Sequence, residues 1–241
     1  MGDHRILSLG EVDSTNEEAR RRAEVGEPGP LWITATRQVG GKGRQGRVWT
    51  SIDGNLYSTL LFRPDLSPQT ASLYSFAACL SVAELFESAG AEAQLKWPND
   101  ALLNGGKAAG VLLEASGAAG RVDWLAIGVG VNLAGHPPAD PGAIHPPTSL
   151  LAETGVAMSP DEAVAGLADR LAHWGGRLSR EGFGPLRSAW LSRAIKLGER
   201  IEARMPGATH SGVFEDVDET GALVLRTRDG IRRLHAADIY F

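Results

Sequence analysis

The segment AQLKWPNDALLNGGKAAGVLLEA, residues 93–115, decides the fold more than any other stretch of this chain. It contains three apolar runs of strand length, and the expected strands are 93–96, 101–103 and 110–115. Two turn-forming groups separate these runs, Trp97-Pro98-Asn99-Asp100 and Asn104-Gly105-Gly106. A further apolar run at 124–131 has the same character, so we expect these strands to share one sheet.

Strand-like and helical runs alternate along the rest of the chain. Further strands are expected at 6–9, 31–36 and 56–62, and helices from Ser14 and over 68–89, 160–180 and 183–194. Ser14 with Glu17, and Thr15 with Glu18, have the spacing of a capping box and so mark a helix start. Residues 133–147 are rich in Pro, Gly and Ala, which indicates a loop that could cover a site. This alternation is typical of the α/β and α+β classes.

The chain changes character at about Lys196. Short strands are expected near 200–203, 211–217, 222–227 and 231–234. Their even spacing is typical of a small barrel or meander, which at this size is marginally stable alone and docks onto a larger domain. We therefore expect two domains, residues 1–194 and residues 195–241.

The composition restricts the class of protein. The chain has 241 residues and a formal net charge of −5, which disfavours broad nucleic-acid binding because phosphates need a basic face. The N-terminus lacks a basic stretch followed by an apolar one, and no window has the apolar length of a membrane span, so we expect a cytoplasmic protein. The single cysteine, Cys79, lies in an apolar run and is expected to pack rather than react. The histidines have no metal-ligand spacing.

The segment Arg37 to Arg47, RQVGGKGRQGR, is far more basic than the chain as a whole. Glycines let a backbone approach a ligand closely, and Arg and Lys bind phosphate or carboxylate oxygens through charge-assisted bonds. A solvated flexible loop would explain the glycines but not the concentration of charge. The segment lacks the Gly-Lys-Ser/Thr ending of a P-loop, and Gly128-Val129-Gly130 lacks the third glycine of a dinucleotide fingerprint. An ATP site here would be of another kind.

A second group of polar residues is Lys96-Trp97-Pro98-Asn99-Asp100, followed by Lys107 and Gly110. Polar groups at strand ends commonly converge on one spot. An ordinary exposed hairpin is the alternative, and for any one of these residues alone we favour it slightly.

Five motifs together resemble a known family. In chain order they are Ser14-Thr15-Asn16, Gly41 to Arg47, Lys96 to Asp100, Gly106-Lys107 through Gly110, and Gly128 to Asn132. This order closely resembles that of the biotin protein ligases, over nearly the whole chain. The resemblance implies an α+β fold, in which a mixed sheet flanked by helices, like that of class II synthetases, precedes a small SH3-like β-barrel. It also implies that biotin and ATP, with Mg²⁺, give biotinyl-5′-AMP, and that a lysine of a carboxylase's biotin carrier domain then takes the biotin.

The resemblance assigns roles by position. The biotin-binding residues would be Ser14, Thr15, Asn16, Gln38, Lys42, Gly43, Arg44, Lys107 and Gly110. The nucleotide-binding residues would be Arg44, Arg47, Trp49, Asn99, Lys107 and Asn132. The catalytic residues would be Lys107, Arg44 and Asp100, with Lys107 beside the biotin carboxylate and the α-phosphate. Asn99 is the candidate ligand of Mg²⁺, and Lys96 is left between phosphate binding and a structural ion pair.

The chain departs from the family at Lys42, where arginine is usual, so a point charge replaces a planar bidentate donor. We also expect a short form without an N-terminal DNA-binding domain, and hence no specific DNA binding. The sequence leaves monomer and homodimer open. The rival hypotheses are a lipoate or related acyl-protein ligase, a regulator that binds biotin or nucleotide without turnover, and an RNA-binding module that uses the basic loop.

Overall fold

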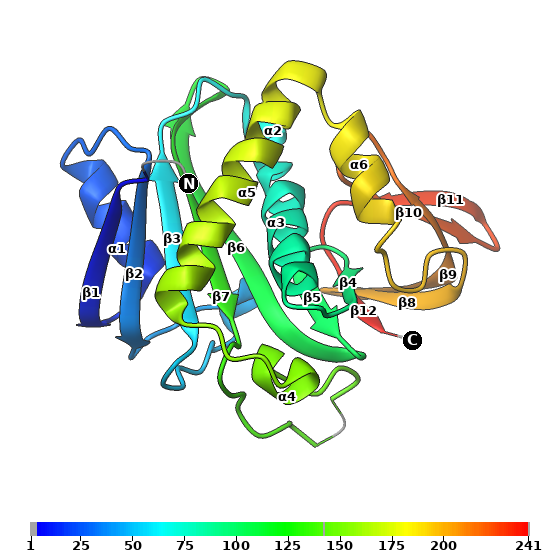
Figure 1. Ribbon diagram of the computed structural model, residues 1–241. Helices are drawn as coiled ribbons and strands as arrows, with labels where there is room; N and C mark the ends of the chain where they lie inside the picture. The colour runs from blue at the N-terminus through cyan, green and yellow to red at the C-terminus, as the bar shows by residue number, and fades with distance from the viewer. Residues whose placement is uncertain (1–3, 142, 241) are drawn as a thin grey trace.

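The computed structural model describes residues 4–141 and 143–240. Seven strands form one sheet in the order β1-β2-β3-β7-β6-β5-β4, in which only β1 and β2 run parallel (Figure 1). The strands are β1 (Ile6–Val12), β2 (Leu31–Gln38), β3 (Leu56–Phe62), β4 (Ala93–Lys96), β5 (Asp100–Leu103), β6 (Gly106–Ala118) and β7 (Arg121–Val131). The expected hairpins of residues 93–115 are therefore confirmed, and they form one edge of the sheet.

Helices cover both faces of this sheet. The helices α3 (Tyr74–Ser88) and α5 (Pro160–Glu181) lie side by side on one face (Figure 1), and α1 (Thr15–Glu24) packs on the other. The alternation of β2 shows why both faces need cover: Trp32 points into the core under α3 and α5, and Ile33 points toward α1. The predicted α+β fold with a flanked mixed sheet is confirmed.

Two helix predictions need correction. The helix expected over 68–89 is two helices, α2 (Pro68–Ser72) and α3, with Leu73 between them. The amides of Leu73 and Phe76 bond three residues back, to Thr70 and Leu73, so the junction is a tight turn of 3₁₀ type. A short helix, α4 (Leu150–Thr154), follows the 133–147 loop and was not predicted, and α6 (Gly184–Leu191) is shorter than expected.

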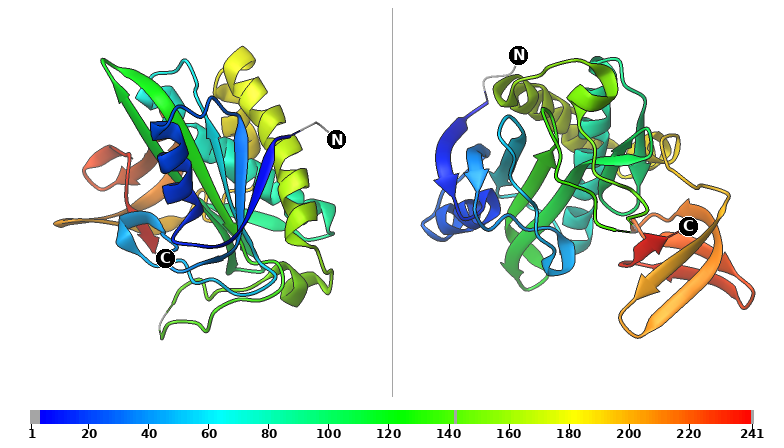
Figure 2. Two further views of the ribbon diagram at one scale, coloured as in Figure 1. Left: turned by 90° about the vertical axis from the view of Figure 1, so that its left-hand side faces the viewer. Right: turned by 90° about the horizontal axis from the view of Figure 1, so that it is seen from below.

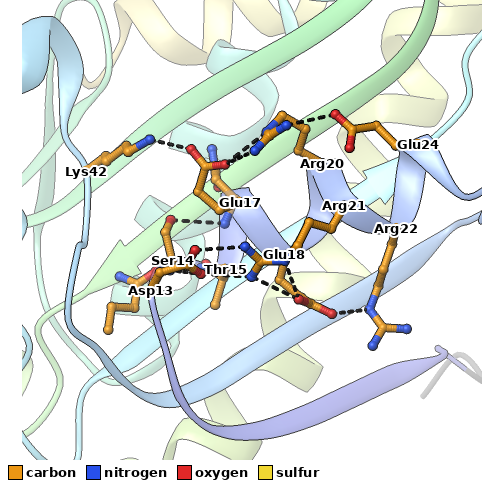
Figure 3. A network of polar contacts seen from close by, with 12 residues as sticks. Asp13, Ser14, Thr15, Glu17, Glu18, Arg20, Arg21, Arg22, Glu24 and Lys42 are labelled. Atoms are coloured by element: carbon orange, nitrogen blue, oxygen red, sulfur yellow. Dashed lines mark hydrogen bonds and ion pairs between the residues drawn. The ribbon is translucent and has the colours of Figure 1, made fainter.

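The helix start at Ser14 is confirmed, but the expected capping box is wrong. The Ser14 hydroxyl accepts from the Asn16 amide at 3.2 Å, and the Ser14 amide donates to Asp13 at 2.7 Å. Glu17 binds Lys42 and Arg20 instead, and Glu18 binds Arg21 and Arg22 (Figure 3). Cations within reach have displaced the backbone amide as partners of these carboxylates.

The C-terminal strands form a second, antiparallel sheet in the order β11-β10-β9-β8-β12 (Figure 2). They are β8 (Arg200–Met205), β9 (Ala208–Val217), β10 (Leu223–Thr227), β11 (Gly230–Leu234) and β12 (Asp238–Tyr240), of which β12 was not predicted. In the described residues no ladder joins β11 to β12, so the SH3-like unit is an open sheet rather than a closed barrel.

The second sheet docks onto the larger domain, as expected, and it contacts the β4–β5 turn and the helices. Trp97 Nε1 donates to the Gly221 carbonyl at 3.1 Å, and Arg187 on α6 binds Asp216 and the Val217 carbonyl. Apolar side chains of β8, β9 and β10 belong to the same core as those of α3 and α5. The division at residues 194 and 195 stays a prediction, since the core is continuous across it.

Cys79 lies inside α3 with 1% of its surface exposed. Burial raises the pKa of its thiol, so the expected packing role is confirmed. None of the described helices combines the length and the apolar character that a bilayer span requires.

Candidate active site

Every residue predicted for the site lines one cavity of about 580 Å³. These residues are Ser14, Thr15, Asn16, Gln38, Lys42, Gly43, Arg44, Arg47, Trp49, Asn99, Asp100, Lys107, Gly110 and Asn132. They come from α1, from the loop after β2, from the β4–β5 hairpin and from β6 and β7. Segments far apart in sequence therefore meet at one place, and the alternative of an isolated exposed hairpin is wrong.

Backbone hydrogen bonds give the basic loop a defined conformation. The Gly40 amide donates to the Asp13 carbonyl at 2.8 Å, the Gly43 amide to the Arg47 carbonyl at 2.7 Å and the Trp49 amide to the Gly41 carbonyl at 2.9 Å. A Cβ at Gly41 would collide with the Trp49 carbonyl oxygen, so this close approach needs glycine. A short 3₁₀ turn, η1 (Arg44–Gly46), forms its tip. Backbone hydrogen bonds therefore shape this segment, while Lys42 and Arg47 stay exposed.

Each cation of the loop faces a partner. Lys42 binds Glu17 of α1 (Figure 3), and this contact is the main cause that raises the pKa of the lysine. Arg47 binds Asp238 of β12, so the C-terminal sheet reaches the loop. Arg44 is half-buried, with Nη1 3.5 Å from Asn99 Oδ1, and burial lowers its pKa. A guanidinium still stays charged at neutral pH, so Arg44 brings a partly desolvated positive charge to the cavity wall.

Lys107 is fixed at both its backbone and its side chain. Its Nζ lies 2.7 Å from Asp100 Oδ1 on the neighbouring strand β5. Its amide donates to the Pro146 carbonyl at 2.8 Å, and its carbonyl accepts from the Thr148 amide at 3.0 Å. The end of the 133–147 loop thus runs beside the lysine, and residues 137, 138, 140, 141 and 143–145 line the cavity.

Trp49 lies across β6, which carries Lys107, and its neighbour β7. A Cβ on Gly130 would lie 2.6 Å from Trp49 Cε2, and one on Gly110 would lie 3.0 Å from Trp49 Cζ3. Lys107 Nζ is 5.6 Å from the centroid of the ring. The two glycines therefore let a flat indole lie on the backbone of β6 and β7 beside the lysine.

A hydrogen-bonded network forms the opposite end of the cavity. Gln38 Oε1 accepts from the Thr15 amide at 2.8 Å and from the Thr15 hydroxyl at 3.1 Å. Thr59 Oγ1 of β3 lies 2.7 Å from Asn16 Oδ1, and Asn16 Nδ2 donates to Glu114 Oε2 at 2.8 Å. Ser14, Thr15 and Asn16 are each less than 5% exposed, so this end presents fixed polar groups in a nearly dry setting.

Asn132 is engaged within the protein. Its Nδ2 donates to the Thr148 carbonyl at 2.9 Å, and its Oδ1 lies 3.3 Å from Asn55 Nδ2. Asn55 Oδ1 in turn accepts from the amides of Leu133, Ala134 and Gly135. This pair fastens the start of the 133–147 loop, and the prediction that Asn132 contacts the nucleotide stays a prediction.

Four residues that support the site were not predicted: Thr59, Glu114, Asn55 and Asp238. Thr59 and Glu114 stand within apolar strands with no turn or glycine beside them. Asn55 follows Gly54 in a turn, and a buried amide after a glycine is the one signal that could have pointed to it. Nothing in the sequence near Asp238 indicates a partner almost two hundred residues away, since only the fold brings it beside Arg47.

Comparison with known proteins agrees with this geometry. Residues 10–132 match the Biotin/lipoate A/B protein ligase family, and residues 196–241 match the Biotin protein ligase C terminal domain. The chain is 45% identical over 239 residues to the biotin--[acetyl-CoA-carboxylase] ligase of Paracoccus denitrificans, a match that covers 97% of this chain and 99% of that protein. It is 33% identical to the bifunctional ligase/repressor BirA of Bacillus subtilis, over 99% of this chain and 74% of that protein.

A solved structure shares the fold. The biotin protein ligase from Aquifex aeolicus in complex with biotin and ATP superposes with a TM-score of 0.81 at 28% identity, covering 98% of this chain and 97% of that one. The chain therefore belongs to the biotin protein ligases, within the biotin/lipoate A/B protein ligase family.

Proposed function

We propose that this chain joins biotin and ATP to biotinyl-5′-AMP and transfers the biotinyl group to a lysine of the biotin carrier domain of a carboxylase. The observation that carries the proposal is that one cavity holds a fixed polar end, around Thr15 and Gln38, and a cationic end, around Arg44 and Lys107. A small molecule with a polar head group and a carboxylate tail would hydrogen-bond to the polar end with its head and pair with the cationic end through its carboxylate. The family membership agrees with this ligand.

In the first step a biotin carboxylate oxygen attacks the α-phosphorus of ATP, and the bond from that phosphorus to pyrophosphate breaks. Negative charge builds on the phosphoryl oxygens, and fixed cations stabilise such charge without reorganising. We assign this task to Lys107 and Arg44, with Asp100 holding the Lys107 ammonium. In the second step a carrier lysine amine attacks the carbonyl carbon, AMP leaves and the amine loses a proton.

Trp49 and Arg47 are assigned to the nucleotide. The Trp49 indole offers a flat face beside Lys107, at a place suited to stacking adenine. Arg47 would exchange its contact with Asp238 for a phosphate of the nucleotide. Ser14, Thr15, Asn16 and Gln38 would then bind the ureido ring of biotin.

Asn99 does not fit a ligand of Mg²⁺. Its Oδ1 faces Arg44 Nη1, and its Nδ2 donates to the Val111 carbonyl. The described residues contain no cluster of three His, Cys, Asp or Glu that could hold a metal ion. Mg²⁺ commonly keeps its waters and binds substrate phosphates, so Asn99 is assigned to orienting Arg44.

The lipoate ligase alternative is disfavoured by the polar end of the cavity. A dithiolane ring has no N–H or carbonyl group, so it could not hydrogen-bond to Thr15, Asn16 and Gln38 as a ureido ring could. A site built to hydrogen-bond a substrate rejects an analogue that lacks those groups by a large factor. The RNA-binding alternative is disfavoured by the net charge of −5, because binding nucleic-acid phosphates needs a broad basic face.

Substrate-dependent release of pyrophosphate tests the adenylation step. With MgATP and no carrier, biotin should give at most one equivalent of pyrophosphate per active site quickly, and lipoate should give none above background. Release with lipoate but not with biotin would replace this proposal with the lipoate alternative. No release with either compound would favour the regulator that binds without turnover. We expect the reaction in the cytoplasm, where ATP is available. The one cysteine is a free thiol, which agrees with a reducing compartment.

A further inference from the structure

The carboxylate of Glu114 takes part in the polar network but has no place in the two reaction steps. It stands on β6, seven positions along the strand from Lys107, and its Oε2 accepts from Asn16 Nδ2 at 2.8 Å. Asn16 lines the cavity and is 4% exposed. A charged side chain therefore sits directly behind an amide that faces the ligand.

The hydrogen-bond partners of Asn16 differ in whether they can fix the orientation of its side-chain amide. Thr59 Oγ1 lies 2.7 Å from Asn16 Oδ1, but a hydroxyl can either donate or accept. Thr59 also has a second contact, with Thr15 Oγ1 at 2.8 Å, to which its proton could go instead. An ionised carboxylate can only accept. Glu114 is thus the one partner in this network that dictates which end of the Asn16 amide lies where.

Gln38 needs no such support. Its Oε1 is held by the backbone amide of Thr15, which can only donate. Turning the Gln38 amide would place its NH₂ group against that donor. The orientations of the two side-chain amides are therefore fixed by different partners. A backbone N–H fixes that of Gln38, and the Glu114 carboxylate fixes that of Asn16.

We propose that Glu114 is a positioning residue that locks the Asn16 amide in one orientation, so that the cavity meets a polar head group with a single pattern of donors and acceptors. This inference rests on the proposed function, since it takes the ureido ring of biotin as the head group. Neutralising Glu114 without changing its shape makes the turned amide nearly as favourable as the native one. Only the fraction of molecules with the native orientation then binds well, and the apparent affinity for biotin falls by that fraction.

The test uses isothermal titration of the full chain with biotin and, separately, with ATP, together with the melting temperature. The variants are Glu114→Gln, Asn16→Asp and the double variant, and Glu181→Gln on α5 is the matched control because Glu181 pairs only with Arg177 in the described contacts. Glu114→Gln should raise the Kd for biotin about twofold, because about half of the molecules keep the native orientation. Its Kd for ATP and its melting temperature should stay at the wild-type values, as should all three quantities for Glu181→Gln.

The double variant separates positioning from folding. Asn16→Asp alone sets two carboxylates against each other and should lower the melting temperature and abolish measurable biotin binding. In the double variant the amide introduced by Glu114→Gln can donate to the new carboxylate, so the melting temperature should recover. Biotin binding should not recover, because the Asn16 N–H donors are gone. If Asn16→Asp does not fold, Glu114→Gln and the double variant still decide the matter.

Two results overturn the inference. One is a Glu114→Gln variant that binds biotin as the wild type does, and the other is a double variant that regains biotin affinity together with stability, which would mean a structural role only. A wild-type chain that does not bind biotin at all would reject the proposed function, and this inference with it. The two failures are therefore distinct.

Discussion

At the scale of single residues, the proposed chemistry depends on Lys107. Its ammonium lies between the Asp100 carboxylate at 2.7 Å and the Trp49 ring at 5.6 Å, and its backbone is fastened to residues 146 and 148. A swing of this side chain into solvent would break the ion pair with Asp100 and take the ammonium away from the Trp49 ring. A charge that is already in place is what adenylation requires, because the transition state then needs no reorganisation of the protein.

Replacement of Lys107 by alanine should separate binding from chemistry. Biotin binding by titration should stay measurable, and single-turnover formation of biotinyl-5′-AMP should fall on the order of a hundredfold or more, the scale of one lost preorganised contact. Arg177→Ala, which removes a cation from α5 far from the cavity, should leave both quantities unchanged. Adenylate formation by Lys107→Ala at the wild-type rate would remove Lys107 from the role assigned to it.

Gly130→Ala should disturb the nucleotide end alone. The new Cβ would lie 2.6 Å from Trp49 Cε2, closer than carbon atoms tolerate, so the indole must move off β7. The KM for ATP should rise about tenfold, as for the loss of one good stacking contact, while the KM for biotin stays at the wild-type value. Steady-state kinetics with a fixed, saturating concentration of either substrate measures the difference. Equal losses for both substrates would show that Trp49 is not specific to the nucleotide.

The residues that line the site could be predicted from the sequence, but the residues that hold them in place could not. Ser14, Lys107 and the basic loop stand in motifs where turn chemistry and charge concentrate, and such motifs are visible in one dimension. Glu114 and Thr59 support the site from the middle of strands, where burial and pairing are decided by neighbours from other segments. The capping box failed for the same reason, because Lys42 and Arg20 compete for Glu17 only in the folded chain.

At the scale of elements, the basic loop is tied to α1 by the pair of Lys42 and Glu17 (Figure 3). The family resemblance implies an arginine at position 42, and the structure gives the lysine found there a partner on the helix that begins at Ser14. Lys42 is 48% exposed and Glu17 19% exposed, so the pair is worth only about 0.2–1 kcal/mol. A free energy of this size favours the observed conformation of the loop but still allows the loop to leave it.

Loss of this pair should loosen the loop. In Glu17→Gln, trypsin cleavage after Lys42, Arg44 and Arg47 should speed up about two- to fivefold, in line with the energy of an exposed pair. Saturating biotin with MgATP should restore protection, because the ligand would hold the same loop. The matched control is Glu24→Gln, which removes the other partner of Arg20 on α1 and does not touch the loop. Mass spectrometry of timed digests gives the rates, and identical rates for Glu17→Gln and wild type would contradict a tether.

Element boundaries show where local reasoning ends. The break at Leu73 has no glycine or proline beside it in the sequence. Both helices pack on β7, and α3 extends from there over β6, β5 and β4. In contrast, α4 carries its own signals, a Ser149 cap and a Gly155 at φ 73°, which the surrounding prolines obscured. The strand β12 has three residues and depends on its pairing with β8, so its short sequence could not have predicted it.

At the scale of the whole molecule, the two sheets act as one body. A continuous core crosses from α3 to β9 and β10, and polar contacts at Trp97, Arg187 and Arg47 fasten the C-terminal sheet at separate points. The sheet also supplies residues 237–240 to the wall of the cavity. The cavity is therefore complete only when the C-terminal sheet is docked. The even spacing of the strands in the sequence does not reveal this.

Arg187→Ala should weaken this docking. It removes a half-buried guanidinium that binds both Asp216 and the Val217 carbonyl, which costs about 2 kcal/mol. For a chain of this size the melting temperature should fall by about 4–8 °C, as measured by calorimetry. Arg226→Ala, which breaks an exposed pair with Glu215 inside the same sheet, should change it by less than about 3 °C. Equal effects of the two variants would argue against docking through Arg187.

The mass of a carrier protein tests the central claim most directly. The chain, biotin, MgATP and an isolated biotin carrier domain are incubated together, and the carrier is then analysed by intact-mass and peptide mass spectrometry. A gain of one biotinyl group on a single lysine is predicted, dependent on biotin and ATP and strongly reduced with Lys107→Ala. A carrier of unchanged mass, under conditions in which an established ligase modifies it, would contradict the proposed function.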